Sequence, residues 1–174
     1  TSMFTILLHP NQDREVLSIY TDRIKGPQIV AAIKELYERF GGVFVVEDNA
    51  AQDYIRQFTV EDTAIPILPM TATRRNYHPV FGIESLAIEM FNGKWIIPCH
   101  RPGVYEPEIH AWISDLFYFD PNEHPGDRLM ASFYAKEGAL RFGPILGDKR
   151  LGGNGKKGSS TAPKSGGSKL RVLG

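Results

Sequence analysis

The chain has 174 residues, which is enough for one domain with a hydrophobic core and too few for two full ones. Its 20 basic and 20 acidic residues give a net charge of zero, which neither favours nor excludes a nucleic-acid partner. A single cysteine, Cys99, excludes an internal disulfide and fits a reducing compartment. No apolar stretch is long enough to span a bilayer, so we expect no membrane partner.

The first third of the chain predicts a hairpin, a helix and a buried strand. Residues 2–9 are an apolar run ending in a His-Pro-Asn turn, and residues 15–21 alternate as its hairpin partner would. A helix is expected from Pro27, because apolar residues then recur at helical spacing up to a Gly-Gly pair that favours a helix end. Residues 43–46 are continuously apolar, which is typical of a strand buried on both faces.

The remaining elements alternate between helices and strands. Two meander strands followed by such alternation predict an α/β domain with a mixed sheet covered by helices. In chain order we expect a helix over 50–58, strands over 65–68 and 94–97 on either side of a helix over 80–91, and helices from Pro107 and over 127–140.

The C-terminal part differs in composition from the rest. From Gly147 onward there are seven basic residues and one acidic residue, a charge of +6. The remaining 13 basic and 19 acidic residues give −6. The segment is also rich in Gly and Ser, so we predict a folded domain over residues 1–141 and a flexible basic tail over 142–174. The tail is either a polyanion-binding extension or a solvated linker, and removal of residues 147–174 should leave the stability of the fold nearly unchanged.

Two places in the chain could carry catalytic carboxylates. Glu47 and Asp48 follow the buried strand 43–46, and the carboxyl ends of strands are where ligands collect in open α/β sheets. Asp127 begins the last predicted helix after a Pro-Gly turn. The alternatives are a solvated turn for the first pair and a helix N-cap for Asp127.

Four segments of the chain, in the same order as in that family, resemble the nuclease domain of the large terminase of tailed phages. Residues 43–52 (VFVVEDNAAQ) are similar to its strand followed by "VEDNAxQ", and residues 124–131 (HPGDRLMA) to its "H-x-D-R-x-x-A" segment. Between them, residues 82–86 and residues 91–98 are similar to its "GI…L…F-x-N-G-K-W…P" stretch. The resemblance covers residues 2–140.

The resemblance implies an RNase H-like fold in which clustered carboxylates bind two Mg²⁺ or Mn²⁺ ions for phosphodiester hydrolysis. Glu47 and Asp127 would be the metal ligands and catalytic residues. Asp48 would take the place of Glu47 if the alignment with the family is shifted by one residue. His124 would either assist the metal site or serve only as a turn residue.

The implied function is a metal-dependent endonuclease that cuts concatemeric double-stranded DNA during phage packaging. The loop bearing Arg74 and Arg75 would contact phosphates, unless it is simply a solvated loop. In the whole protein the partners would be an ATPase domain, the portal and the small terminase, in the host cytoplasm. This chain has no P-loop spacing, so we expect no ATP site in it.

Two other functions fit the same residues. One is a non-catalytic DNA- or portal-binding packaging module that uses the basic tail and the arginine loop. The other is a different RNase H-like nuclease, of resolvase or transposase type, although such an enzyme should lack the "F-x-N-G-K-W…P" stretch.

The family's first strand, which carries an essential aspartate in a "GxDxA"-like segment, has no counterpart before Thr1. Thr1 aligns with the second strand, so we expect an N-terminally truncated domain that arises as a fragment, from a split gene or at an intein junction. Its sheet should have an edge or an unfilled central position next to residues 43–46. We expect such a chain to show little nuclease activity alone.

Overall fold

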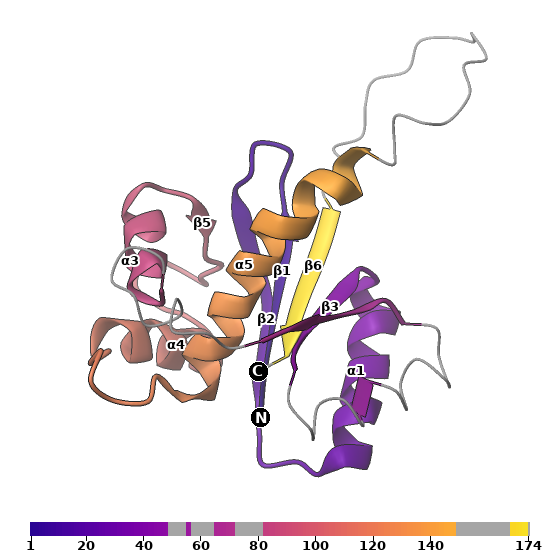
Figure 1. Cartoon of the computed structure of the whole chain (residues 1–174). Helices are drawn as coiled ribbons and strands as arrows, with labels where there is room; N and C mark the ends of the chain where they lie inside the picture. The colour runs from indigo at the N-terminus through magenta and orange to yellow at the C-terminus, as the bar shows by residue number, and fades with distance from the viewer. Residues whose placement is uncertain (49–54, 57–64, 72–81, 149–167, 174) are drawn as a thin grey trace, which may run out of the picture.

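The computed structural model describes residues 1–48, 55–56, 65–71, 82–148 and 168–173, and these build a mixed α/β fold (Figure 1). A six-stranded sheet has the order β4-β3-β6-β1-β2-β5. Strand β1 is antiparallel to β2 and β6, whereas β3 is parallel to β4 and β6. The predicted mixed sheet flanked by helices is therefore confirmed. The strands are β1 (Ser2–Leu8), β2 (Arg14–Thr21), β3 (Val43–Glu47), β4 (Ile67–Met70), β5 (Trp95–Ile96) and β6 (Ser168–Leu173), and the helices are α1 (Gly26–Phe40), α3 (Glu84–Phe91), α4 (Pro107–Phe117) and α5 (Gly126–Asp148).

Local sequence signals account for the N-terminal elements. The hairpin β1–β2 and helix α1 lie where the sequence predicted them. Helix α1 begins where the Gln28 side chain accepts a hydrogen bond from the Lys25 backbone N–H at 2.9 Å. It ends at Gly41, whose φ of 64° lies in the left-handed region that glycine adopts without strain. The Gly41 N–H donates to the Tyr37 carbonyl and so satisfies the end of the helix.

The central position of the sheet is taken by a strand that the sequence did not predict. Strand β6 lies between β1 and β3, with Met3 and Val46 both opposite Leu173 (Figure 1). The structure thus differs from the predicted flexible tail over 142–174, and from the expected gap or edge next to residues 43–46. A six-residue strand after a Gly/Ser-rich stretch gives a weak local signal, and its hydrogen-bond partners are distant in sequence.

The two faces of the sheet carry separate hydrophobic clusters. One face packs against α1 through residues such as Ile33, Phe44 and Val46. The other packs against α5, α4 and α3, and α5 crosses it in Figure 1. Buried residues of this second cluster include Phe4, Ile6, Val43, Val45, Leu86, Trp112, Leu129, Phe133 and Tyr134.

Several boundaries differ from the sequence prediction. Helix α5 runs to Asp148, because Gly143 continues to pack on β1 so closely that a Cβ added there would overlap the Leu8 side chain. Strand β4 begins at Ile67 rather than at residue 65, and α3 begins at Glu84 rather than at residue 80. Most of the predicted helix over 50–58 lies outside the described residues. No helix among those described is long and apolar enough to cross a membrane.

We predict that Val172→Pro lowers the free energy of unfolding by about 2–3 kcal/mol more than Val172→Ala. Proline removes a backbone N–H, and a buried carbonyl left without its donor costs about 1–3 kcal/mol in addition to backbone strain. Alanine keeps the N–H and therefore serves as the matched control. Urea unfolding measures the difference, and equal effects of the two substitutions would contradict the central placement of β6.

Candidate active site at one edge of the sheet

The ends of three central strands meet at one edge of the sheet. Strands β3 and β6 are parallel and both finish there, with Val46 opposite Leu173. Strand β1 is antiparallel to β6 and therefore starts there, with Met3 opposite Leu173. The carboxyl ends of parallel strands are where catalytic groups gather in α/β sheets.

Glu47 is the last residue of β3 and is half-buried. It follows Val43 and Val45 at the two-residue period of a strand, which assigns it to the same face as these residues. Both valines belong to the cluster that includes Leu129 and other residues of α5. Glu47 therefore belongs to the face of the sheet that α5 covers.

Asp127 lies in the first turn of α5, where a carboxylate complements the partial positive charge of the helix N-terminus. Gly126 precedes it with a φ of 77°, a conformation that favours glycine and lets the chain turn into the helix. The Asp127 carboxylate lies 2.8 Å from the Thr1 amino nitrogen, at the start of β1. The structure therefore brings Asp127 to the same edge of the sheet as Glu47.

The sheet fixes the separation of β1 and β3, the strands at whose ends the two acids lie. Strands β1 and β3 flank β6, so their backbones are about 9–10 Å apart, two strand spacings. Glu47 reaches this edge from the end of β3, and Asp127 reaches it from the first turn of α5, beside the start of β1. No group of three or more His, Cys, Asp or Glu side chains close enough to hold a metal ion occurs in the described part of the chain.

Asp48 has local partners of its own. Its backbone N–H donates to the Met70 carbonyl at 2.9 Å, and its carboxylate lies 3.5 Å from the Arg56 guanidinium. These contacts tie Asp48 to β4 and to the segment containing Arg56. Of the two acids at the end of β3, Glu47 is the one on the face of α5.

His124 has a structural role in the turn before α5. Its Nδ1 accepts a hydrogen bond from the Gly126 backbone N–H at 3.1 Å. The imidazole also lines a surface cavity of about 290 Å³ together with Asp120 and Glu123. Hydrogen bonds from the backbone and side chain of Asn122 lower the pKa of Asp120, so this carboxyl stays ionised. The turn role expected as one alternative for His124 is therefore present.

Arg74 and Arg75 lie outside the described residues, so their expected contact with DNA stays a prediction.

Two residues at this edge were missed from the sequence. Asp22 follows β2 and exchanges backbone hydrogen bonds with Thr1, which brings a further acid to the same edge. Arg128 contacts Asp115 at 2.5 Å, Glu108 at 3.3 Å and Thr21 Oγ1 at 3.3 Å. It thereby fixes the first turn of α5 against α4 and β2. The sequence signal that could have identified Arg128 was its position next to Asp127.

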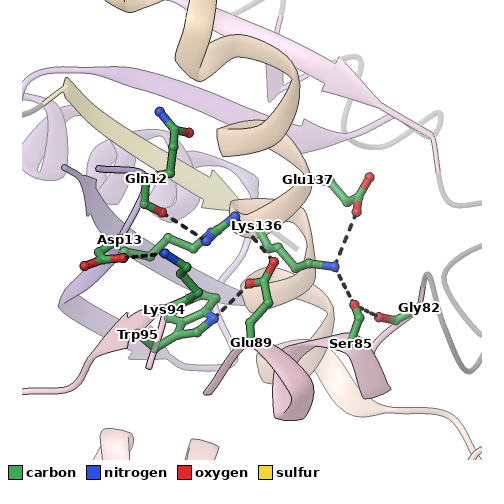
Figure 2. Close-up of polar contacts among 10 residues, drawn as sticks. Gln12, Asp13, Gly82, Ser85, Glu89, Lys94, Trp95, Lys136 and Glu137 are labelled. Atoms are coloured by element: carbon green, nitrogen blue, oxygen red, sulfur yellow. Dashed lines mark hydrogen bonds and ion pairs between the residues drawn. The ribbon is translucent and has the colours of Figure 1, made fainter. Parts of the chain in front are cut away.

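A buried polar network lies on the α5 side of the sheet, among α5, α3 and the start of β2 (Figure 2). Arg14 is 4% exposed and lies 3.4 Å from Glu89, which also accepts a hydrogen bond from Trp95 Nε1 at 3.0 Å. Lys136 is equally buried and donates to the Ser85 hydroxyl, with Glu137 at 3.6 Å. The network attaches the α3–β5 segment to the rest of the fold.

Burial lowers the pKa of Lys136, because the charged ammonium loses its hydration in the core. Glu89 and Glu137 oppose this effect by favouring the charged form. The position of Lys136 in the middle of a helix gave no sequence signal of burial, since lysine is rarely buried without partners.

Comparison with known proteins did not assign the chain to a family. No family model, curated protein or solved structure matches it.

We predict that the free energy of unfolding rises with pH in the wild type relative to Lys136→Met. The folded protein releases the Lys136 proton at lower pH than the unfolded chain, so the cost of burying the charge falls as pH rises. The effect covers the window from the lowered pKa up to the ordinary value of about 10.4, with a limiting slope of about 1.4 kcal/mol per pH unit. Urea unfolding between neutral and alkaline pH measures it.

Lys94→Met is the matched control, because Lys94 is about half exposed and pairs with Asp13 at the surface. The same pH slope in the Lys136→Met and Lys94→Met variants would contradict the assignment of this effect to Lys136.

Proposed function

We propose that this chain is a metal-dependent DNA endonuclease domain of the phage large-terminase type, with an RNase H-like fold. The observation that carries the proposal is that Glu47 and Asp127, 80 positions apart in the sequence, reach the same edge of the sheet on the face covered by α5. Strand β6 pairs with β3 on the side where the resemblance left either a sheet edge or an unfilled central position.

The donor set suits a hard divalent cation. Glu47 and Asp127 offer carboxylate oxygens, which Mg²⁺ and Mn²⁺ prefer. In the proposed site these two residues hold the ion, which when bound supplies Lewis-acid stabilisation and activation of water for phosphodiester hydrolysis. Arg128 positions the first turn of α5, and with it Asp127, through its contacts with Asp115 and Glu108.

The proposal extends to partners and location. Double-stranded DNA is the substrate, and Arg74 and Arg75 contact its phosphates. In the packaging machine the domain works with an ATPase domain, the portal and the small terminase in the host cytoplasm.

A second candidate function is a non-catalytic DNA- or portal-binding packaging module. The observation that favours it is the lack of a three-ligand cluster in the part of the chain that the structure describes. Two carboxylates alone neutralise less of the charge of a cation pair than three or four would.

Metal binding tests the proposed site directly. We expect Mn²⁺ titrated calorimetrically into the protein to bind at least about tenfold more weakly to Glu47→Gln and to Asp127→Asn, because a charge-assisted contact contributes about 1.5–3 kcal/mol. Glu38→Gln is the matched control, since Glu38 is an exposed acid on α1. Wild-type affinity in both site variants would reject the shared site.

DNA cleavage separates the two candidate functions. Residues 1–174 alone should convert little supercoiled plasmid in Mg²⁺ or Mn²⁺, because an incomplete ligand set holds the cations weakly. Adding an upstream segment that carries the first-strand aspartate should switch cleavage on only if its strand replaces β6 beside β3, and Asp127→Ala should then abolish it. DNA binding without metal-dependent cleavage in the extended protein would favour the binding module.

A further inference from the structure

The groove between β1 and β3 has the properties of a strand-acceptor site. Neither strand pairs with the other, and each pairs with β6 instead, over Met3–Leu8 on β1 and Val43–Val46 on β3. Without an occupant, both inner edges would present unpaired N–H and C=O groups in the middle of the sheet. Each buried group left unpaired costs about 1–3 kcal/mol, so the folded state requires a strand there.

The groove sets the direction and register of its occupant. A strand must run antiparallel to β1 and parallel to β3 to complete both hydrogen-bond ladders. Leu170 falls in the cross-strand row of Ile6 and Val43, which are buried core residues. Val172 falls in the row of Phe4 and Val45, which are fully buried. The segment Ser168–Leu173 thus matches the groove in direction and, in the rows of Leu170 and Val172, in apolar residues.

The covalent connection to β6 is long compared with the separation that it bridges. Residues 149–167, 19 positions, join α5 to β6. Ser168 is opposite Leu8, and Leu8 lies against Gly143 near the end of α5, so α5 ends close to where β6 begins. A fully extended chain of this length would reach about 60 Å, far beyond what closure within one chain needs.

We propose that β6 is exchangeable between copies of this chain, so that β6 of one copy fills the β1–β3 groove of a second copy and forms an intertwined dimer. The exchanged strand makes the same hydrogen bonds and has the same register as β6 within one chain. The closed monomer and the exchanged dimer therefore differ chiefly in the entropy of joining the strand to its groove. The covalent connection holds its own strand at an effective concentration of roughly millimolar, which keeps dilute protein monomeric. Exchange therefore grows with protein concentration during folding. This inference is independent of the proposed nuclease.

Engineered disulfides test the exchange in full-length protein. Thr5 and Arg171 lie directly opposite each other on β1 and β6, and cross-strand Cα separations of about 4.5–5.5 Å fall within the range that a disulfide spans. One copy carries Thr5→Cys and a differently tagged copy carries Arg171→Cys. Both also carry Cys99→Ser, because Cys99 is free and exposed. The two copies are unfolded together, refolded at several concentrations and oxidised.

We expect a disulfide-linked heterodimer whose yield rises about tenfold for a tenfold rise in protein concentration, because exchange is bimolecular whereas closure within one chain is not. The matched control pairs Thr5→Cys with Ser18→Cys on separate copies. These residues are opposite in the β1–β2 hairpin, whose short turn does not exchange, so this mixture should remain uncrosslinked.

A single chain carrying Thr5→Cys, Arg171→Cys and Cys99→Ser reports the position of β6. An internal disulfide in this chain together with no heterodimer from the mixture would overturn the exchange. Failure of the internal disulfide to form would also overturn it, because β6 would then not occupy the groove. Equal heterodimer yields from the mixture and from the hairpin control would show non-specific crosslinking and reject the proposal.

Discussion

The inner edges of β1 and β3 face one gap in the middle of the sheet, and the structure depends on filling it. Backbone groups buried in a sheet must be paired, and only a strand of the right direction satisfies both edges at once. Strand β6 does so from the far end of the chain. With it in place, the rows from Phe4 and Ile6 to Val43 and Val45 form one continuous surface on which α5 packs. The two hydrophobic clusters therefore share a scaffold that neither could form without the central strand.

The position of α5 follows from that surface and determines much of the chemistry. Its N-terminal turn is fixed by Arg128, and its later turns press Gly143 onto Leu8. Between these points the helix buries Lys136, whose ammonium is satisfied by Ser85 and Glu137. A buried, partnered lysine is a weak source of stability, since the cost of desolvation offsets most of the attraction. It does favour an arrangement in which Ser85 of α3 faces α5, because the Ser85 hydroxyl accepts a hydrogen bond from the buried ammonium.

The candidate site is a consequence of the same geometry. Glu47 ends β3, Asp127 begins α5, and both reach one edge because β3 and β1 flank the same central strand. A polar residue at a strand or helix end sacrifices little packing, so such positions can accept carboxylates that the core cannot. The terminase-like proposal rests on this convergence and on the order of the motif segments. It gives Glu47 and Asp127 a common role, whereas the contacts of Asp48 and His124 have local structural explanations.

The sequence by itself determined the elements whose signals are local. The β1–β2 hairpin, helix α1 with its glycine end, the apolar strand β3 and helix α4 after Pro107 all follow from periodicity, turn residues and caps. It also indicated Glu47 and Asp127 as candidate residues, because acids at element ends are visible without a fold. Only the tertiary structure decided that residues 168–173 form the central strand, that α5 continues past Gly143, and that Lys136 and Arg14 are buried. The physical reason is the same in each case: the stabilising partners of these residues are distant in sequence, and no local pattern records which backbone edge, helix or carboxylate will meet them.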